Sequence, residues 1–549
     1  PELVFLPEYA ATLPNSNFIL AKKNMAQWQG RRGGRESMDE FEMDMRILRD
    51  FINTNFLSEE TFQEDGNTFV NLLSRGWSGI SKLNKFDLSS MYFNYAGSIY
   101  SPNFPILDIV MNTMLKQEEN IQGRQFFRMF SGMGNDQRAS AYLNGKSFEQ
   151  AILDNTLSTE VFYEMMKLKG VYLRNYINSK LAANEFKEFM ADFTKKYQFQ
   201  EVNFTYLNSE FIRRFHFNLM DLIPTWYTAN STPRFIVKGI DADQIEMDDY
   251  TKYIVKFSIH NPTNVEGVIT VNVEEGGGMF PGGPRGGRGR MAQMESKPAK
   301  NYIIGPQAYK EIRILCDERP SALTIMTNIA QNLPSIIRQH FAKVTTTSSD
   351  TTSGMFDTDA TLFTFNPKEI TVDNEDPGFR IIESNQKNKL QSLFRKESED
   401  KYKNLNSWMP PSRWTATVGT NYYGDYINSV MYKKAGNGSN KAEWTTQIQI
   451  PGFYEVFVYS ADLPFFGWHR GRSEEKKTQY YTVKHDDGEE EIAVETEGGP
   501  RQQGWNTLGT FYFSAGEAKV TLSDKGSTPD QIIFADAVKW VYTNNNKQK

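Results

Sequence analysis

The sequence predicts a multidomain α+β protein in which a mainly helical part comes first and all-β domains follow. Residues 37–230 show apolar side chains at helical spacing, beginning with Phe41 and Met45. After Pro233 the pattern changes to short runs rich in Val, Ile, Phe and Tyr, which are typical of β-strands. Strand-like runs return from about residue 405. These observations predict a helical region, a small β-sandwich, a mixed linker region and a C-terminal β-sandwich.

Length and composition narrow the class of protein. At about 150 residues per domain, 549 residues correspond to about three to four domains. With 61 basic and 67 acidic residues the net charge is −6, which argues against a chain built to bind nucleic acid. A single cysteine, Cys316, excludes an internal disulfide and a cysteine-based zinc site. No apolar run reaches the roughly 18 residues of a membrane-spanning helix. Because the chain begins at Pro1 without a signal peptide, we expect an excised piece of a longer protein.

Local signals place the first helices. Ser147 and Gln150 have the spacing of a capping box. One long amphipathic helix is predicted from the spacing of Val161, Met165, Leu168, Tyr172 and Tyr176. Asn184 can cap the next helix, whose buried face is predicted to be Phe186, Phe189, Met190 and Phe193.

Few residues are arranged for catalysis or metal binding. No histidine has a second one within three to five residues, which excludes a helical metal pair among His216, His260, His340, His469 and His485. His216 and His260 lie in apolar runs and are interpreted as core or edge residues. The acidic run Asp486–Glu491 surrounds Gly488 and predicts a solvated hairpin turn rather than paired catalytic carboxylates.

A Gly-, Met- and Arg-rich insertion occupies residues 275–300. It contains Arg285, Arg288 and Arg290 in a setting that RNA-binding segments also use. Three arginines in an acidic chain release few counterions, so we interpret the insertion as a long flexible hairpin loop.

The N-terminal quarter resembles the gluzincin aminopeptidases, whose helix H-E-x-x-H-x-W-x-G binds zinc. The stretch from Asn71 to Gly79 keeps the Trp and the Gly of that motif. Asn71 and Arg75 stand where the family has its histidine ligands, and Leu72 stands in place of the general base. Asn94 lies near the position of the third ligand, a glutamate. The resemblance implies a degenerate, thermolysin-like peptidase region without zinc chemistry.

Further landmarks extend this resemblance over residues 1–320. Asn15 stands in place of the glutamate that anchors the substrate amine in the family. Lys167 stands in place of the tyrosine that steadies the oxyanion. Trp226 followed by Pro233 is similar to the passage from helices to a β-domain. The resemblance therefore implies a pseudo-metallopeptidase that needs no cofactor.

The C-terminal part resembles the golvesin/xanthan-lyase carbohydrate-binding-like domain over residues 405–543. The segments that carry this resemblance are Tyr454–Tyr459, Tyr481–His485, Gly504–Gly509, Val520–Asp524 and Phe534–Val541. Such domains are β-sandwiches of secreted or surface proteins. The resemblance implies an extracytoplasmic location, in the periplasm or at the cell surface.

Within that domain, Trp468, His469 and Arg470 are the candidate ligand-binding residues. They lie in a Gly-flanked loop that can project an aromatic ring onto the C–H face of a sugar. The arginine can bind an acidic sugar's carboxylate through two hydrogen bonds. Trp505 and Trp540 are interpreted as sandwich core. For Trp468 a binding role and a packing role both stay open.

The resemblances divide the chain into five regions and leave three functions open. The regions are a degenerate peptidase-like domain at 1–120, a helical bundle at 121–232, a small β-sandwich at 233–318, a mixed linker region at 319–404 and the golvesin-like sandwich at 405–543. The first function is a non-catalytic binding or scaffolding protein of a Bacteroidetes-type bacterial envelope, with a protein partner. The second is the part outside the membrane of a permease-fused peptidase or glycan-active enzyme whose active site lies elsewhere. The third is adhesion through glycan binding alone.

We predict that this chain binds no catalytic zinc and cleaves no peptide. The five histidines supply no helical ligand pair, and a permanent cation at Arg75 would repel the metal. Elemental analysis of protein purified without added metal should show no stoichiometric zinc, and aminoacyl fluorogenic substrates should not be cleaved. Stoichiometric zinc together with chelator-sensitive cleavage would contradict this prediction.

Overall fold

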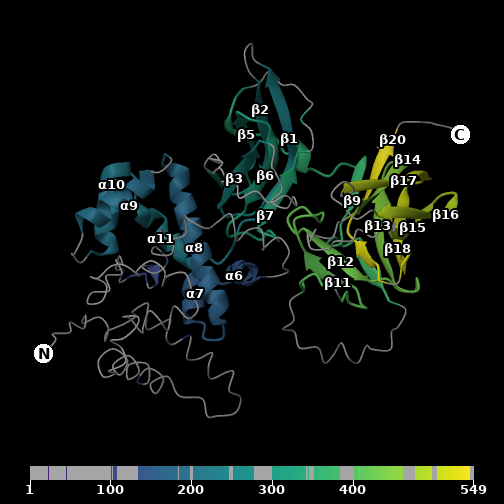
Figure 1. Cartoon of the computed structure of the whole chain (residues 1–549), viewed down its shortest axis with the longest axis horizontal. Coiled ribbons are helices and arrows are strands. Elements are labelled where there is room, and N and C mark those ends of the chain that lie inside the picture. Colours follow the sequence, from purple (N-terminus) through teal and green to yellow (C-terminus); the bar gives the residue numbers. More distant parts are fainter. Residues whose placement is uncertain are drawn as a thin grey trace, which may run out of the picture. The chain divides into compact units, whose positions relative to one another are not determined.

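The computed structural model describes the chain in segments, which divide into two compact units. Apart from isolated positions up to residue 110 and at 344, the described residues are 134–182, 185–197, 202–246, 251–276, 299–341, 351–383, 401–406, 409–460, 477–496, 504–528 and 530–543. One unit comprises residues 1–120 and 138–232, and the other comprises residues 121–137 and 233–549. The first unit is built mainly of helices and the second of antiparallel sheets (Figure 1).

The described α-helices all end before residue 230. Ser147 caps α7 as predicted: its hydroxyl accepts the Gln150 N–H at 3.1 Å, and the Gln150 side chain accepts the Ser147 N–H at 2.9 Å. The helices are α6 (Asn135–Leu143), α7 (Phe148–Leu153), α8 (Thr159–Lys180), α9 (Glu185–Lys196), α10 (Phe204–Phe215), the 3-10 helix η6 (Leu219–Asp221) and α11 (Ile223–Thr228).

The buried faces of α8 and α9 follow the predicted spacing to different degrees. In α9 the predicted set is buried, namely Phe186, Phe189, Met190 and Phe193. In α8 only Val161 and Met165 of the predicted set are buried, and the other three are half-buried. The buried face of α8 is instead completed by Phe162, Met166, Lys169 and Leu173.

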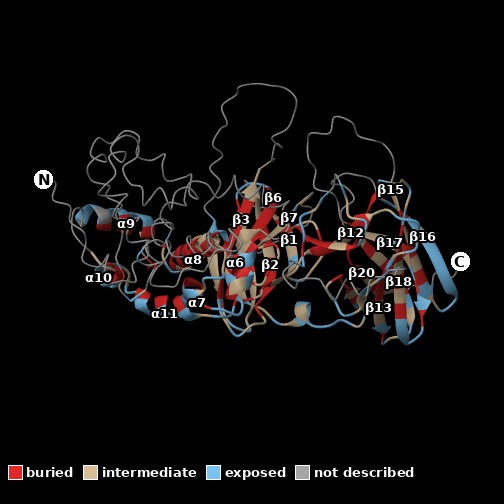
Figure 2. Ribbon diagram, turned by 90° about the horizontal axis from the view of Figure 1, so that it is seen from below, coloured by how far each residue is buried: buried red, intermediate tan, exposed pale blue. Residues whose placement is uncertain are grey.

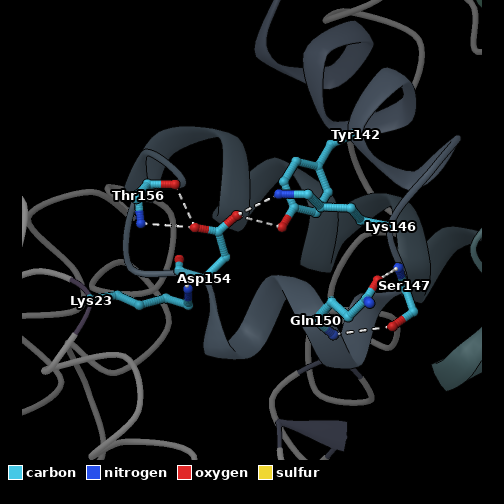
Figure 3. A network of polar contacts seen from close by, with 7 residues as sticks. All are labelled: Lys23, Tyr142, Lys146, Ser147, Gln150, Asp154 and Thr156. Carbon is cyan, nitrogen blue, oxygen red and sulfur yellow. Dashed lines mark hydrogen bonds and ion pairs between the residues drawn. The ribbon is translucent and has the colours of Figure 1, made fainter.

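The C-cap of α7, Asp154, collects several donors (Figure 3). Its carboxylate accepts the Tyr142 hydroxyl at 2.7 Å, the Thr156 N–H at 2.9 Å and the Lys146 ammonium at 3.2 Å. Its carbonyl accepts the ammonium of Lys23, a side chain only 3% exposed, at 2.8 Å. Although burial acts to raise it, hydrogen bonds from Thr156 and Tyr142 hold the pKa of Asp154 well below its usual range. The carboxylate therefore stays charged and fixes the end of α7.

A second buried lysine, Lys169, joins α8 to α11. The Lys169 ammonium donates to the Trp226 carbonyl, and the Trp226 indole N–H donates to the Lys169 carbonyl at 3.2 Å. The ammonium lies 5.1 Å from the centre of the Trp226 ring and 5.8 Å from that of Phe148. Burial lowers the pKa of Lys169 to about 7, because the charged form loses its hydration.

Replacing Lys169 with Met should change how the stability of the helical unit depends on pH. The folded-state pKa of about 7 lies below the ordinary value of 10.5, so the unfolded chain binds more protons between these values. Wild-type stability should therefore rise with pH across this window, by at most about 1.4 kcal/mol per pH unit. Lys169→Met should reduce this rise in thermal melts of the full chain followed by the helical circular dichroism signal, leaving the contribution of Lys23, whose pKa burial lowers to about 8. The matched control, Lys167→Met on the same helix, should keep the whole rise. Equal pH slopes for Lys169→Met and wild type would contradict a buried titrating ammonium.

Residues 236–357 form a β-sandwich of two antiparallel four-stranded sheets. The strand orders are β1-β2-β5-β8 and β4-β3-β6-β7. The strands are β1 (Ile236–Glu246), β2 (Thr251–His260), β3 (Gly267–Glu275), β4 (Lys300–Ile304), β5 (Tyr309–Cys316), β6 (Pro320–Met326), β7 (Ile336–His340) and β8 (Gly354–Asp357). Phe257, Ile269, Ile312 and Ile325 belong to its buried core. The insertion at 275–300 joins β3 to β4 and lies almost wholly outside the described residues.

The C-terminal part forms a second sandwich with a small additional sheet. The strand orders are β17-β14-β20-β9, β10-β13-β18-β15-β16 and β11-β12-β19. The strands are β9 (Glu369–Val372), β10 (Phe379–Ile382), β11 (Thr415–Val418), β12 (Ser429–Lys434), β13 (Lys441–Ile448), β14 (Gly452–Ser460), β15 (Lys477–His485), β16 (Gly488–Thr496), β17 (Gly504–Phe513), β18 (Gly516–Gly526), β19 (Ile532–Ala535) and β20 (Val538–Thr543), and the 3-10 helix η7 (Thr361–Phe363) precedes them. Trp444, Tyr454, Val520 and Trp540 lie in the core, each at most 1% exposed.

The predicted fold class, a multidomain α+β protein built on a mainly helical thermolysin-like region, is wrong. The structure is mostly strand, arranged in several antiparallel sheets. Periodicity failed where strands are short and their partners are distant, as for Val372 of β9, which pairs with Val538 of β20. Residues 319–404, expected to be a mixed linker region, instead supply β6, β7 and β8 to the first sandwich and β9 and β10 to the second.

A buried ion pair links β12 to β18 in the second sandwich. The Lys433 ammonium donates to the Asp524 carboxylate, and the two side chains are 3% and 0% exposed. Asp524 also accepts the Gly438 N–H at 2.7 Å and the Asn440 side-chain amide at 2.9 Å. Although burial acts to raise it, hydrogen bonds from Lys433 and Asn440 hold the pKa of Asp524 below its usual value. The carboxylate is therefore charged and surrounded by donors.

Replacing Lys433 with Met should destabilise the second sandwich by about 3–5 kcal/mol, because it leaves a buried carboxylate without its cation. The neighbouring Lys434, whose ion pair with Asp530 is exposed, supplies the matched control. Lys434→Met should cost at most about 1 kcal/mol. Urea unfolding of the full chain followed by tryptophan fluorescence measures both. Equal losses for the two variants would show that burial does not set the strength of the Lys433–Asp524 pair.

Candidate functional site

One sheet of the second sandwich carries aromatic side chains on its outer surface. Along β14, burial alternates, so that Tyr454, Val456 and Val458 point into the core. The intervening side chains point outward. We call the aromatic face the outward side chains Phe453, Phe457 and Tyr459 of β14 and Trp505 and Tyr512 of β17.

Strand pairing brings these rings together in two pairs. Tyr459 lies opposite Trp505, with ring centres 5.3 Å apart and planes at 79°. Phe453 lies opposite Tyr512, also at 5.3 Å, with planes at 75°. Phe457 lies between the two pairs on β14. At about 3.3 Å per residue the row extends over about 20 Å, which suits an extended chain rather than a single small molecule.

A β-bulge decides that Trp505 faces outward. The register between β14 and β17 shifts at Val456 and Phe457, which pair with Gly509 and Thr507 and leave Leu508 as the extra residue. Gly509 has φ 132°, a conformation that favours glycine. An extra residue reverses the alternation of inward and outward positions on one side of it. The bulge therefore keeps Leu508 in the core and turns Trp505 out.

Two side chains from other elements complete the Trp505 end of the face. Tyr423, from the loop between β11 and β12, has its ring centre 5.1 Å from Trp505 and 5.6 Å from Tyr459. Lys539 of β20 places its ammonium 4.5 Å from the centre of the Trp505 ring. The same ammonium lies 3.4 Å from a carboxylate oxygen of Glu369 on β9. Aromatic surface, one cation and one anion thus lie side by side.

This arrangement suits binding more than catalysis. The half-buried rings of Tyr459 and Trp505 offer apolar surface, and Tyr423 and Lys539 limit how they can turn. Asn506, next to Trp505, lies opposite the inward-facing Val458 and donates to the buried Ser460 hydroxyl at 2.8 Å, so it does not belong to the aromatic face. The rings match the C–H surface of a sugar, and Lys539 and Glu369 beside them can form hydrogen bonds with its hydroxyl groups.

The burial of the tryptophans in the structure agrees with the sequence-based prediction for Trp540 and differs from it for Trp505. Trp540 is 0% exposed and lies in the core as predicted. The interpretation of Trp505 as core is wrong, because it is half-buried on the outer face. Trp468, His469 and Arg470 lie outside the described residues. In the sequence these three residues follow Ser460, the last residue of β14, which pairs with Gly504 next to Trp505. The alternation of Phe457 and Tyr459 with valines was the sequence signal for the aromatic face.

The peptidase-like positions gain no support. Asn15, Asn71, Leu72, Arg75 and Asn94 all lie outside the described residues. Lys167 is described, and its ammonium forms an ion pair with Glu164, one turn earlier in α8, at 2.7 Å. In the described part of the chain no group of three His, Cys, Asp or Glu side chains is placed to hold a metal ion.

The histidines and the acidic run have structural places. His260 is 7% exposed, its Nδ1 lies 3.1 Å from the Ala308 carbonyl oxygen, and its ring stacks on Tyr309 at 3.9 Å. His216 ends α10 in the left-handed conformation. The acidic run forms the β15–β16 turn, where His485 pairs with Gly488, and β16 is mostly exposed (Figure 2). Among the described helices, none has the length and apolar character needed to cross a membrane.

Comparison with known families identifies the second sandwich. Residues 402–542 match the family model of the Golvesin C-terminal domain. This agrees with the resemblance predicted for 405–543. The core of the Golvesin domain also uses Ile370 and Val372 of β9, which precede the matched residues. The comparisons give no evidence for the gluzincin resemblance, and no curated protein matches the chain.

Solved structures are similar only distantly. A xanthan lyase from Paenibacillus is 15% identical with a TM-score of 0.23; the match covers 57% of this chain and 26% of the lyase. A two-domain protein of unknown function from Bacteroides fragilis is 10% identical with a TM-score of 0.15, over 56% of this chain and 94% of that one. The CBM22-1–GH10 modules of a Clostridium thermocellum endo-1,4-beta-D-xylanase, complexed with xylohexaose, are 17% identical with a TM-score of 0.15, over 25% of this chain and 26% of that one. Similarity at this level carries no function to this chain.

Proposed function

We propose that this chain is an extracytoplasmic binding protein whose Golvesin domain binds glycan chains through the aromatic face. The observation that carries the proposal is the row of outward rings along β14 and β17, with Trp505 and Tyr459 held against Tyr423 and Lys539. The family match supports the location and the class of ligand. The role is binding rather than catalysis, and a protein partner in the envelope and tethering to a membrane stay predictions.

The charges around the rings favour a glycan with few or no acidic groups. Lys539 is the cation nearest Trp505 among the described contacts, and Glu369 lies within ion-pair distance of it. To reach the Lys539 ammonium, an acidic sugar would have to displace the Glu369 carboxylate from its ion pair. Glu455 lies on the same surface, between Phe453 and Phe457. A uronate would therefore meet two carboxylates for one ammonium. The aromatic face is thus better suited to neutral sugars that stack and accept hydrogen bonds.

Tyr459→Ala and Trp505→Ala should each weaken glycan binding at least tenfold, or about 1.4 kcal/mol. The full chain would be screened on a polysaccharide array, and the strongest ligand would be titrated by calorimetry. Tyr480→Ala is the matched control, because Tyr480 faces outward on β15 in the opposite sheet. It should bind like wild type.

A parallel variant, Trp468→Ala, separates the aromatic face from the loop that the sequence singled out. Loss of binding in Trp468→Ala alone would move the site to that loop. Binding that survives both Tyr459→Ala and Trp505→Ala, or an array on which no glycan is retained, would overturn the proposal. Melting temperatures of all four variants should lie close to wild type, because Trp505 and Tyr459 are half-buried rather than core residues.

A further inference from the structure

The two-residue link Asp536–Ala537, through which the chain passes from β19 to β20 in another sheet, holds both sides of the Trp505 end of the aromatic face. Asp536 accepts the Tyr423 N–H at 3.3 Å from each carboxylate oxygen. The next residue, Ala537, accepts the Tyr459 N–H at 2.9 Å. The Asp536 carbonyl accepts the indole N–H of the core residue Trp444 at 3.0 Å. The link thus connects the Tyr423 loop, β14 and the core.

Tyr423 is held by this anchor at its backbone and by a side-chain hydrogen bond with Thr371 of β9. Its loop runs from Gly419 to Asn428, between β11 and β12, and is closed by the Gly419 N–H donating to the Asn428 carbonyl at 3.0 Å. Gly424 leaves no room for a side chain, since a Cβ would lie 1.9 Å from the Ile427 carbonyl oxygen. A loop closed on itself in this way places the Tyr423 ring on Trp505 through the bond to Asp536.

The Asp536 carboxyl lies in an unusually acidic and dry place. Asp536 is 2% exposed and Asp373, at the end of β9, is 7% exposed. Burial, with the charge of Asp373 adding to it, raises the pKa of Asp536 well above its usual value. Burial likewise raises the pKa of Asp373 to about 9. The groups that face this pair are the carboxyls of Glu375, Asp376 and Asp425, the phenols of Tyr402, Tyr422, Tyr423 and Tyr481, and the cations Lys401 on Glu375 and Lys238 on Asp425.

We propose that Asp536 is a positioning residue that makes the aromatic face sensitive to pH: its neutral carboxyl holds Tyr423 against Trp505, and its ionisation releases the loop. The proposal rests on the proposed function of the aromatic face. A charged carboxylate would accept the Tyr423 N–H more strongly. The free energy needed to bury two negative charges, however, exceeds the free energy gained from that stronger hydrogen bond. The neutral pair stabilises the closed loop fully below the ordinary pKa of an aspartate. This stability is lost as pH rises through the raised pKa, which is about 9 for Asp373.

The fluorine NMR signal of Trp505 tests the inference without any glycan. The full chain would be labelled with 5-fluorotryptophan, and Trp505→Phe would assign the resonance. In wild type the Trp505 resonance should shift when the pH is raised from the ordinary pKa of an aspartate into the alkaline range, as the Tyr423 ring leaves it. Asp536→Asn keeps an acceptor for the Tyr423 N–H and cannot ionise, so its Trp505 resonance should stay constant. Asp487→Asn, which changes an exposed carboxyl of the β15–β16 turn, should titrate like wild type.

A second variant covers the case in which Asp536→Asn fails to fold. Asp373→Asn removes the neighbouring charge and should move the Trp505 midpoint to lower pH. A wild-type Trp505 resonance that does not change over the range, or an Asp536→Asn protein that titrates like wild type, would overturn the inference. These outcomes are independent of sugar binding. Where the array yields a glycan, wild-type affinity should fall with rising pH, by at most tenfold per pH unit for one linked proton, and Asp536→Asn affinity should not.

Discussion

The buried ion pair between Lys433 and Asp524 is the constraint on which the Golvesin domain depends. Two charges removed from water are tolerated only if donors surround the carboxylate, and Gly438 and Asn440 supply them. Gly436 lies so close that a Cβ there would be 2.3 Å from the carboxylate. The loop between β12 and β13 is therefore wrapped around Asp524 and has little freedom of sequence.

The effects of this pair reach the aromatic face through the small sheet. Lys433 lies on β12, directly opposite Ile533 of β19. β19 ends at Ala535, directly before Asp536 and Ala537, which accept the N–H groups of Tyr423 and Tyr459. The buried ion pair thus lies on the strand that pairs with β19 just before Asp536 and Ala537. Asp536 is also held from the core, because its carbonyl accepts the indole N–H of Trp444, a residue only 1% exposed.

How far the sequence predicts the structure of this chain depends on which interactions are local in sequence. The capping box of α7, the apolar face of α9 and the strands of the Golvesin domain follow from spacing within a few residues, and these features are present. Trp505 could not be placed in this way. Counting alternate residues back from the buried Phe513 and Phe511 puts Trp505 inside, and only the bulge at Leu508, set by pairing with β14, puts it outside.

The peptidase resemblance shows the same limit. Its landmarks included the helix that contains Lys167 and the later Trp226. In the structure Lys169, two residues beyond Lys167, meets Trp226 through two hydrogen bonds between α8 and α11. Lys167 itself is paired with Glu164 on the same helix. The packing of two helices thus accounts for both landmarks. Neither residue requires a catalytic explanation.

The position of the buried carboxyls of Asp373 and Asp536 is itself an argument for function in the Golvesin domain. The link between β19 and β20 could be built from amide or apolar residues without burying carboxyl groups. Such a link would make the domain more stable. Here the desolvation cost of Asp373 and Asp536 falls where one carboxyl reaches the backbone of Tyr423. Buried polar groups that lower stability tend to be found where a site needs them. Asp536 holds the Tyr423 ring against Trp505. The free energy lost by burying the carboxyls therefore serves the geometry of the aromatic face rather than the stability of the fold.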